Sequence, residues 1–195
     1  MLPPSEMLDG LKLRYGESHR HYHTWDHVQA LLNHYQRIED TLFDPDATLW
    51  ALYWHDAIYD PQKGDNEDRS ADLLREQAGG ILNAKSLNRA DIIIRATKQH
   101  LVPEGLSADD RQDLQTFLDI DLSILAAAEH VFDAYETAIR EEYEFVPEDI
   151  YKQARGAILS GFLKRERLYF SDHYHSRWED RARANLQRSI SRLMS

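Results

Sequence analysis

An adjacent histidine and aspartate, His55 and Asp56, stand in the middle of the apolar and aromatic run 51–60. A run of this kind is expected to be buried. Burying a carboxylate costs free energy unless the group is paired or bound to a metal ion. We therefore expect the pair to have partners elsewhere in the chain. Imidazole and carboxylate groups together are suited to bind a metal ion.

Four of the ten histidines fall within residues 19–27. His27 is followed by apolar residues, so it is the histidine of this segment that we expect to face the core. His23 lies four residues earlier and shares a helix face with His27 if the helix begins early enough. The alternative is a polar turn rich in histidine, in which His27 is a core histidine satisfied by hydrogen bonds.

Two further acids, Asp119 and Asp121, are embedded in the apolar segment 116–125. One of them could cap the short helix expected to follow, while the other is exposed to solvent. The other interpretation is that one of the two carboxylates is a buried partner for His55 and Asp56.

Together these segments supply two imidazoles and two carboxylates. Such mixed nitrogen and oxygen ligands suit Mn, Fe, Co, Ni, Zn or Mg without strong selectivity. Four protein ligands leave positions open on an octahedral ion for water and a phosphoryl oxygen. The ion would lower the pKa of the water and offset phosphate charge.

The composition restricts the partners. The chain has 195 residues, no cysteine and a net charge of -11. Disulfides and thiolate metal ligands are therefore excluded, and neither nucleic acid nor an anionic membrane surface is the expected partner. No signal peptide is visible and no apolar run is long enough to span a membrane, so we expect a cytoplasmic protein. The oligomeric state is open.

Helical periodicity dominates, alternation typical of strands is nearly absent, and Pro and Gly are few. The sequence therefore predicts one all-α domain over residues 1–195. The expected helices are 5–15, one beginning near Thr24, one following Pro45, and then 66–77, 88–99, 109–118, 121–127, 129–143, 149–167 and 174–194.

The order His27, His55–Asp56, Asp121 resembles the HD superfamily of metal-dependent phosphohydrolases, whose pattern is H…HD…D. The sequence segments around these residues are similar to those of a bacterial branch known as predicted HD phosphohydrolases. These segments are 22–28, 54–60, 65–71 and 118–122. The resemblance runs from about residue 20 to beyond 143. It implies an HD-type helical bundle with a metal-site core over about 20–145, followed by packing helices over about 149–194.

Carried over position by position, the resemblance implies that His27, His55, Asp56 and Asp121 bind one divalent cation. Asp121 is chosen over Asp119 because the last aspartate of the family pattern precedes a helix that contains leucine. No metal is assigned to His173 and His175 near the C-terminus, because residues two apart do not share a helix face.

Further candidates surround these ligands. Glu67 could act as general acid or base, or be an ordinary acid in the first turn of a helix. His23 could face a leaving group. Candidates for contact with the substrate phosphate are Arg20, Arg69, Lys98 and His100, for which solvated cations and a helix-ending histidine are the alternatives.

The expected function is a metal-dependent phosphohydrolase that acts on a phosphomonoester, nucleotide or related small phosphorylated substrate through a metal-activated water, with Asp56 as a catalytic residue. One alternative is a non-catalytic HD-fold sensor or scaffold that binds metal or nucleotide. Another is a helical interaction domain whose His and Asp side chains satisfy one another.

Overall fold

The computed structural model describes residues 1–194. Among these residues it is helical and has no β-strand, only an isolated β-bridge between Gly79 and Leu82, so the prediction of an all-α fold is confirmed. The α-helices are α1 (Ser5–Tyr15), α2 (Trp25–Tyr35), α3 (Pro45–Trp54), α4 (Asn66–Ala78), α5 (Ala84–Thr97), α6 (Ala108–Asp121), α7 (Glu129–Glu142), α8 (Glu148–Leu163) and α9 (Asp172–Leu193). Two short 3-10 helices are η1 (Glu39–Thr41) and η2 (Leu122–Ala126).

The helices fall into two units. The first comprises Met1–Ile120, and the second begins at Asp121, the last residue of α6. The predicted single domain, with a metal-site core over about 20–145, is not decided by this division and stays a prediction. No helix in the described part of the chain is both long enough and apolar enough to cross a membrane.

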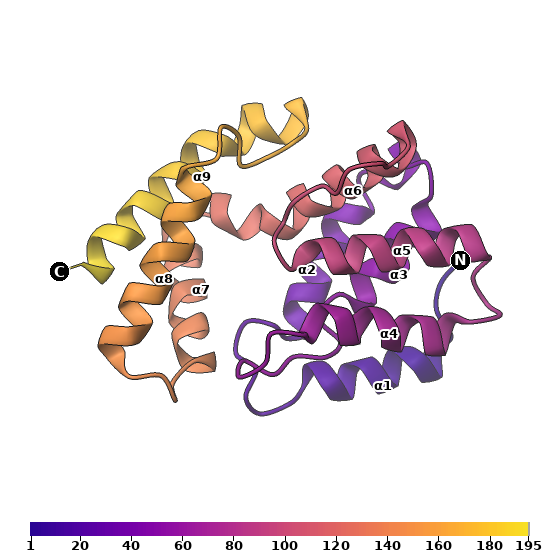
Figure 1. Ribbon diagram of the computed structural model, residues 1–195, viewed down its shortest axis with the longest axis horizontal. Helices are drawn as coiled ribbons and strands as arrows, with labels where there is room; N and C mark the ends of the chain where they lie inside the picture. The colour runs from indigo at the N-terminus through magenta and orange to yellow at the C-terminus, as the bar shows by residue number, and fades with distance from the viewer. Residues whose placement is uncertain (195) are drawn as a thin grey trace. The chain divides into compact units, whose positions relative to one another are not determined.

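α3 lies at the centre of the first unit. Every residue from Ala47 to Trp54 is buried, as expected for a helix that is apolar on all sides. Asp44 caps its start by accepting a hydrogen bond from the Ala47 amide at 3.0 Å, and Pro45 occupies the first helical position, where a missing N–H costs nothing. α1, α2, α4 and α5 all pack against α3, and Figure 1 shows α4 and α5 side by side.

In the second unit, α9 packs against both α8 and η2 (Figure 1). Asn185 of α9 is buried, and its side-chain amide donates to the carbonyls of Leu125 at 2.8 Å and Ala127 at 3.0 Å. These two bonds satisfy carbonyl groups at the end of η2 that have no helical partner.

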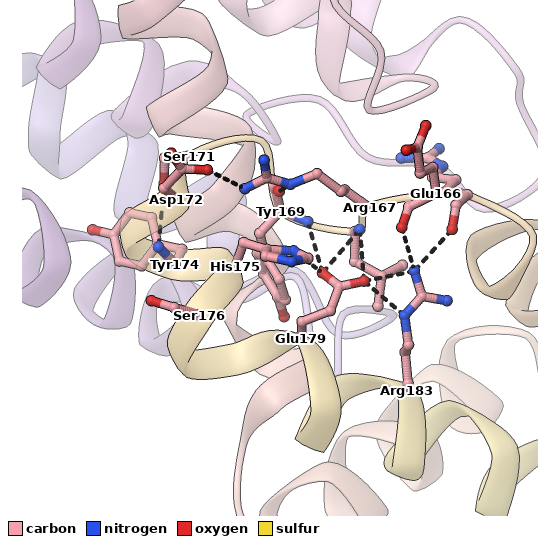
Figure 2. Close-up of polar contacts among 12 residues, drawn as sticks. Glu166, Arg167, Tyr169, Ser171, Asp172, Tyr174, His175, Ser176, Glu179 and Arg183 are labelled. Atoms are coloured by element: carbon pink, nitrogen blue, oxygen red, sulfur yellow. Dashed lines mark hydrogen bonds and ion pairs between the residues drawn. The ribbon is translucent and has the colours of Figure 1, made fainter.

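Glu179 of α9 organises the connection between α8 and α9, as Figure 2 shows. Its carboxylate accepts hydrogen bonds from the amide of Leu168 at 3.0 Å, from Arg183 at 2.7 Å and from His175 Nδ1 at 3.1 Å. Arg183 also donates to the carbonyls of Leu163, Arg165 and Glu166. One ion pair therefore fixes the backbone of a segment without regular structure.

Three helix boundaries differ from the predicted ranges by three residues or more. α5 begins at Ala84 instead of 88 because Asn83 caps it, accepting from the amides of Lys85 and Ser86 at 3.0 Å each. α6 continues through Asp121 instead of ending near 118. α8 ends at Leu163 instead of 167, where the contacts of Arg183 with carbonyl oxygens replace the helical ladder.

Candidate metal centre

His27 reaches the site from the first turn of α2. The helix begins at Trp25, after Thr24 in extended conformation, and its buried face includes His27, Val28 and Leu31. The prediction that His27 faces the core is therefore confirmed. His23 precedes the helix, so the two histidines do not share a helix face.

His55 follows the last residue of α3, and a backbone contact sets its ring. Its Nδ1 lies 2.9 Å from the carbonyl oxygen of Leu52. A carbonyl can only accept, so Nδ1 carries the hydrogen and the lone pair of the neutral ring is on Nε2. This is how metal-binding histidines are commonly oriented.

The lone pair of His55 faces His27 and Asp56. The two Nε2 atoms of His27 and His55 are 3.1 Å apart, and both side chains are buried. Asp56 Oδ2 lies 3.0 Å from His55 Nε2 and 3.9 Å from His27 Nε2. Burial alone would raise the pKa of Asp56, but the imidazoles of His55, His23 and His27 together hold it below its usual value.

Asp121 is carried to the histidines by one face of α6. Asp113, Phe117 and Asp121 are spaced four residues apart, so they lie on the same face. Asp113 accepts hydrogen bonds from the amides of Phe43 and Asp44 at the start of α3. Phe117 packs edge-on against the His55 ring, with centroids 5.8 Å apart.

One turn beyond Phe117, Asp121 completes a group of three residues. One ligand atom each from His27, His55 and Asp121 lies within 4.8 Å of the others, so this group could hold a metal ion. Asp119 is fully buried but is not part of the group, and Asp121, at the N-cap position of η2, makes no capping hydrogen bond with its side chain. The choice of Asp121 over Asp119 agrees with this geometry.

The donor set fits a divalent cation. Ligands about 2.1 Å from an octahedral ion are about 3.0 Å apart in adjacent positions and about 4.2 Å apart in opposite ones. The separations of 3.1 Å between His27 and His55 and of 3.0 Å between His55 and Asp56 match adjacent positions, and the 3.9 Å between His27 and Asp56 lies between the two values. The Nε2 lone pair of His55 and the Asp56 carboxylate also need a proton or a cation between them, because both are acceptors.

The structure places the other predicted site residues as follows. His23 stacks on Tyr59, with ring centroids 4.2 Å apart, and contributes to the low pKa of Asp56. Arg20 is buried, and its guanidinium contacts backbone carbonyls on both sides of the site. The proposed roles of His23 and Arg20 toward a substrate are not tested by these contacts and stay predictions.

The remaining candidates lie on or near α4 and α5. Glu67 is in the first turn of α4 and half-buried, and Arg69 is exposed. Lys98 donates to Asp68 at 2.9 Å. His100, just beyond α5, has a positive φ of 50°, a conformation uncommon outside glycine. Their catalytic and phosphate-binding roles also stay predictions.

Tyr59 and Phe117 are two site residues that sequence reasoning missed. Tyr59 contacts His19, Arg20 and His23 through its ring or its carbonyl group. A signal existed for Phe117, because it lies four residues, about one helical turn, before Asp121. No such signal existed for Tyr59, whose partners are about 40 residues away.

Comparisons of the chain with protein-family models, with curated proteins and with solved structures gave no match.

Proposed function

We propose that the protein is a metal-dependent phosphohydrolase that acts on a small phosphorylated substrate, as its resemblance to the HD superfamily implies. The observation that supports this most is the buried pair of imidazoles, whose Nε2 atoms are 3.1 Å apart with the Asp56 carboxylate beside them. Two imidazoles and a carboxylate supply the mixed nitrogen and oxygen ligands that suit a divalent cation.

In this proposal one divalent cation would be held by His27, His55, Asp56 and Asp121, and it would acidify a water molecule and offset the charge of a phosphate group. The hydrogen bond from His55 Nδ1 to Leu52 keeps the Nε2 lone pair directed at the site. Asp56, whose pKa is low, stays ionised at neutral pH and can accept a proton or a hydrogen bond from water at its carboxylate oxygens.

The test combines metal content with turnover. The protein is purified without chelator, its divalent metals are quantified, and phosphomonoesters and nucleotides are assayed with added Mn, Co, Ni or Mg. We expect about one metal ion per chain and hydrolysis of at least one substrate. Asp56→Asn should abolish turnover, whereas Asp91→Asn, which removes a buried acid paired with Arg75 and Arg95, should retain it.

Absence of bound metal under every condition would refute the ligand set and the enzyme proposal together. Metal binding without turnover of any phosphate ester would favour a sensor or scaffold instead. Equal losses of turnover in Asp56→Asn and Asp91→Asn would indicate a general effect on folding.

A further inference from the structure

The guanidinium of Arg20 is enclosed by backbone. Its side chain is 0% exposed, and its charge is paired with Glu17, whose carboxylate accepts from Nε at 3.0 Å. Burying a cation in this way is costly unless nearly all of its donors are used. The partners of the guanidinium N–H donors therefore indicate the role of Arg20.

Three of these contacts are backbone carbonyls. Nη1 donates to the carbonyl of Asp56 at 2.7 Å and to that of His23 at 3.1 Å, and Nη2 donates to the carbonyl of Ala57 at 3.2 Å. Asp56 and Ala57 belong to the turn after α3, and His23 belongs to the segment before α2. One planar group thus ties the turn that carries His55 to the segment that leads into α2, whose first turn carries His27.

The position of Arg20 is favourable in two further ways. Carbonyl groups at the end of a helix lack helical partners and carry partial negative charge, so a cation is stabilised there. The guanidinium also lies over the rings of Tyr15 at 5.1 Å and Tyr59 at 5.4 Å, which adds cation–π attraction. These contacts leave the guanidinium group little freedom to turn toward a ligand.

We propose that Arg20 is a positioning residue: its bonds to the carbonyls of His23, Asp56 and Ala57 hold the two segments in register, so that the Nε2 atoms of His27 and His55 face each other. This inference rests on the proposed metal function and differs from a role of Arg20 in binding phosphate. A phosphate-binding arginine affects the substrate, whereas a positioning arginine affects the imidazoles before any substrate binds.

The experiment compares Arg20→Met and Arg20→Lys with a matched control, Arg89→Met. Arg89 is also a largely buried arginine of the first unit, but it pairs with Asp44 and Asp110 at the other end of α3. The first readout is the ¹⁵N spectrum of the histidine rings in metal-free protein, which reports the tautomer of each ring and the contact between the two Nε2 atoms. The second is affinity for Co²⁺, measured by competition with a coloured chelator, together with the visible spectrum of the bound ion.

We expect His55 to be protonated at Nδ1 in the wild type and in both methionine variants, because the Leu52 carbonyl sets this tautomer. The Nε2 signals of His27 and His55 should shift in Arg20→Met but not in Arg89→Met, because the two rings no longer face each other when the contacts of Arg20 are lost. Co²⁺ affinity should fall about 10- to 100-fold in Arg20→Met, the range typical for loss of a contact that orients a metal ligand. Arg20→Lys should recover little of the Co²⁺ affinity, because a single ammonium group cannot replace the planar guanidinium with its several donors.

The proposal is overturned if Arg20→Met and Arg89→Met give the same ring spectra and the same Co²⁺ affinity. It is also overturned if Arg20→Met raises only the KM for a phosphorylated substrate, since that result indicates phosphate binding. If the wild type binds no Co²⁺, the proposed function fails, and the ring spectra alone then decide the positioning role.

Discussion

The tautomer of His55 is set by a single backbone oxygen. The carbonyl of Leu52 lies three residues earlier, in the last turn of α3, and accepts from Nδ1. The ring therefore presents its lone pair to His27. At the scale of residues, the chemistry of the site depends on such contacts as much as on the identity of the ligands.

The two aspartates at the end of α6 give a direct test of the ligand assignment. Asp121→Asn should lower metal affinity by at least about 100-fold, more than the loss of a supporting contact usually causes. Asp119→Asn alters a buried acid that is not part of the group with His27 and His55, so a smaller loss is expected. Competition titration with a chelator measures both, and the reverse order would make Asp119 the ligand.

A second prediction at this scale concerns pH and Glu179. Burial alone would raise the pKa of Glu179, but hydrogen bonds from the Leu168 amide and from Arg183 bring it below its ordinary value. Because the pKa is lower in the folded state, the stabilisation is complete above the ordinary range of glutamate. It is lost as pH falls through the folded-state value.

Glu179→Gln should therefore lower the free energy of unfolding by about 2 kcal/mol at neutral pH, and the difference should shrink at acid pH. Urea unfolding at several pH values measures this. Glu144→Gln, which changes an exposed glutamate before α8, serves as the control. A difference between wild type and Glu179→Gln that does not vary with pH would contradict the role of the charge.

At the scale of elements, the two ends of α3 have different roles: the first is held by stabilising contacts, and the second carries residues of the candidate site. Its start is held by Asp44, whose carboxylate accepts from the Ala47 amide, Ser86 Oγ and Arg89. Its other end carries His55 and Asp56. The helix has 10 residues, so the two ends are about 15 Å apart.

Replacement of Asp44 should therefore destabilise the fold without changing the metal centre. Asp44→Ala should cost about 2 kcal/mol of unfolding free energy, because a capping bond and a charge pair are both lost. Asp46→Ala, which removes a more exposed acid of the same turn, should cost less than about 1 kcal/mol. Thermal unfolding measures the loss of stability, and chelator competition measures the metal affinity. A large loss of metal affinity in Asp44→Ala would contradict the expectation that the metal centre is unchanged.

The helices themselves were largely predictable, because the spacing of apolar residues and the Pro and Gly residues that mark loops are local signals. The start of α5 was missed because Asn83 was not recognised as its cap. His27, His55 and the pair Asp119 and Asp121 could be singled out because polar groups in apolar runs need partners. The choice of Asp121 within that pair came from the resemblance to the HD pattern. The contacts of Arg20 with Asp56 and Ala57 could not be predicted, because they are made to backbone oxygens 36 and 37 residues away, and the type of a residue does not indicate the partner of its backbone oxygen.

At the scale of the whole molecule, metal binding should be linked to unfolding. A ligand that binds only the folded state at a free concentration of 100 times its Kd adds about 2.7 kcal/mol of stability. For a chain of this size the Tm should then rise by about 5–10 °C. Scanning calorimetry with and without Co²⁺ measures the shift, and an equal rise in Asp121→Asn would show that the ion binds elsewhere.

The last turn of α3 and the segment that follows it have a consequence for transplanting this site into another scaffold. The carbonyls of Tyr53, Asp56, Ile58 and Tyr59 accept hydrogen bonds from the side chains of Tyr15, Arg20, Ser70 and His19, in that order. A graft that copied only two histidines and two aspartates would leave these carbonyls without their donors and the loop free to move. The minimal portable unit is therefore the ligands together with the donors on α1, α4 and the segment between α1 and α2.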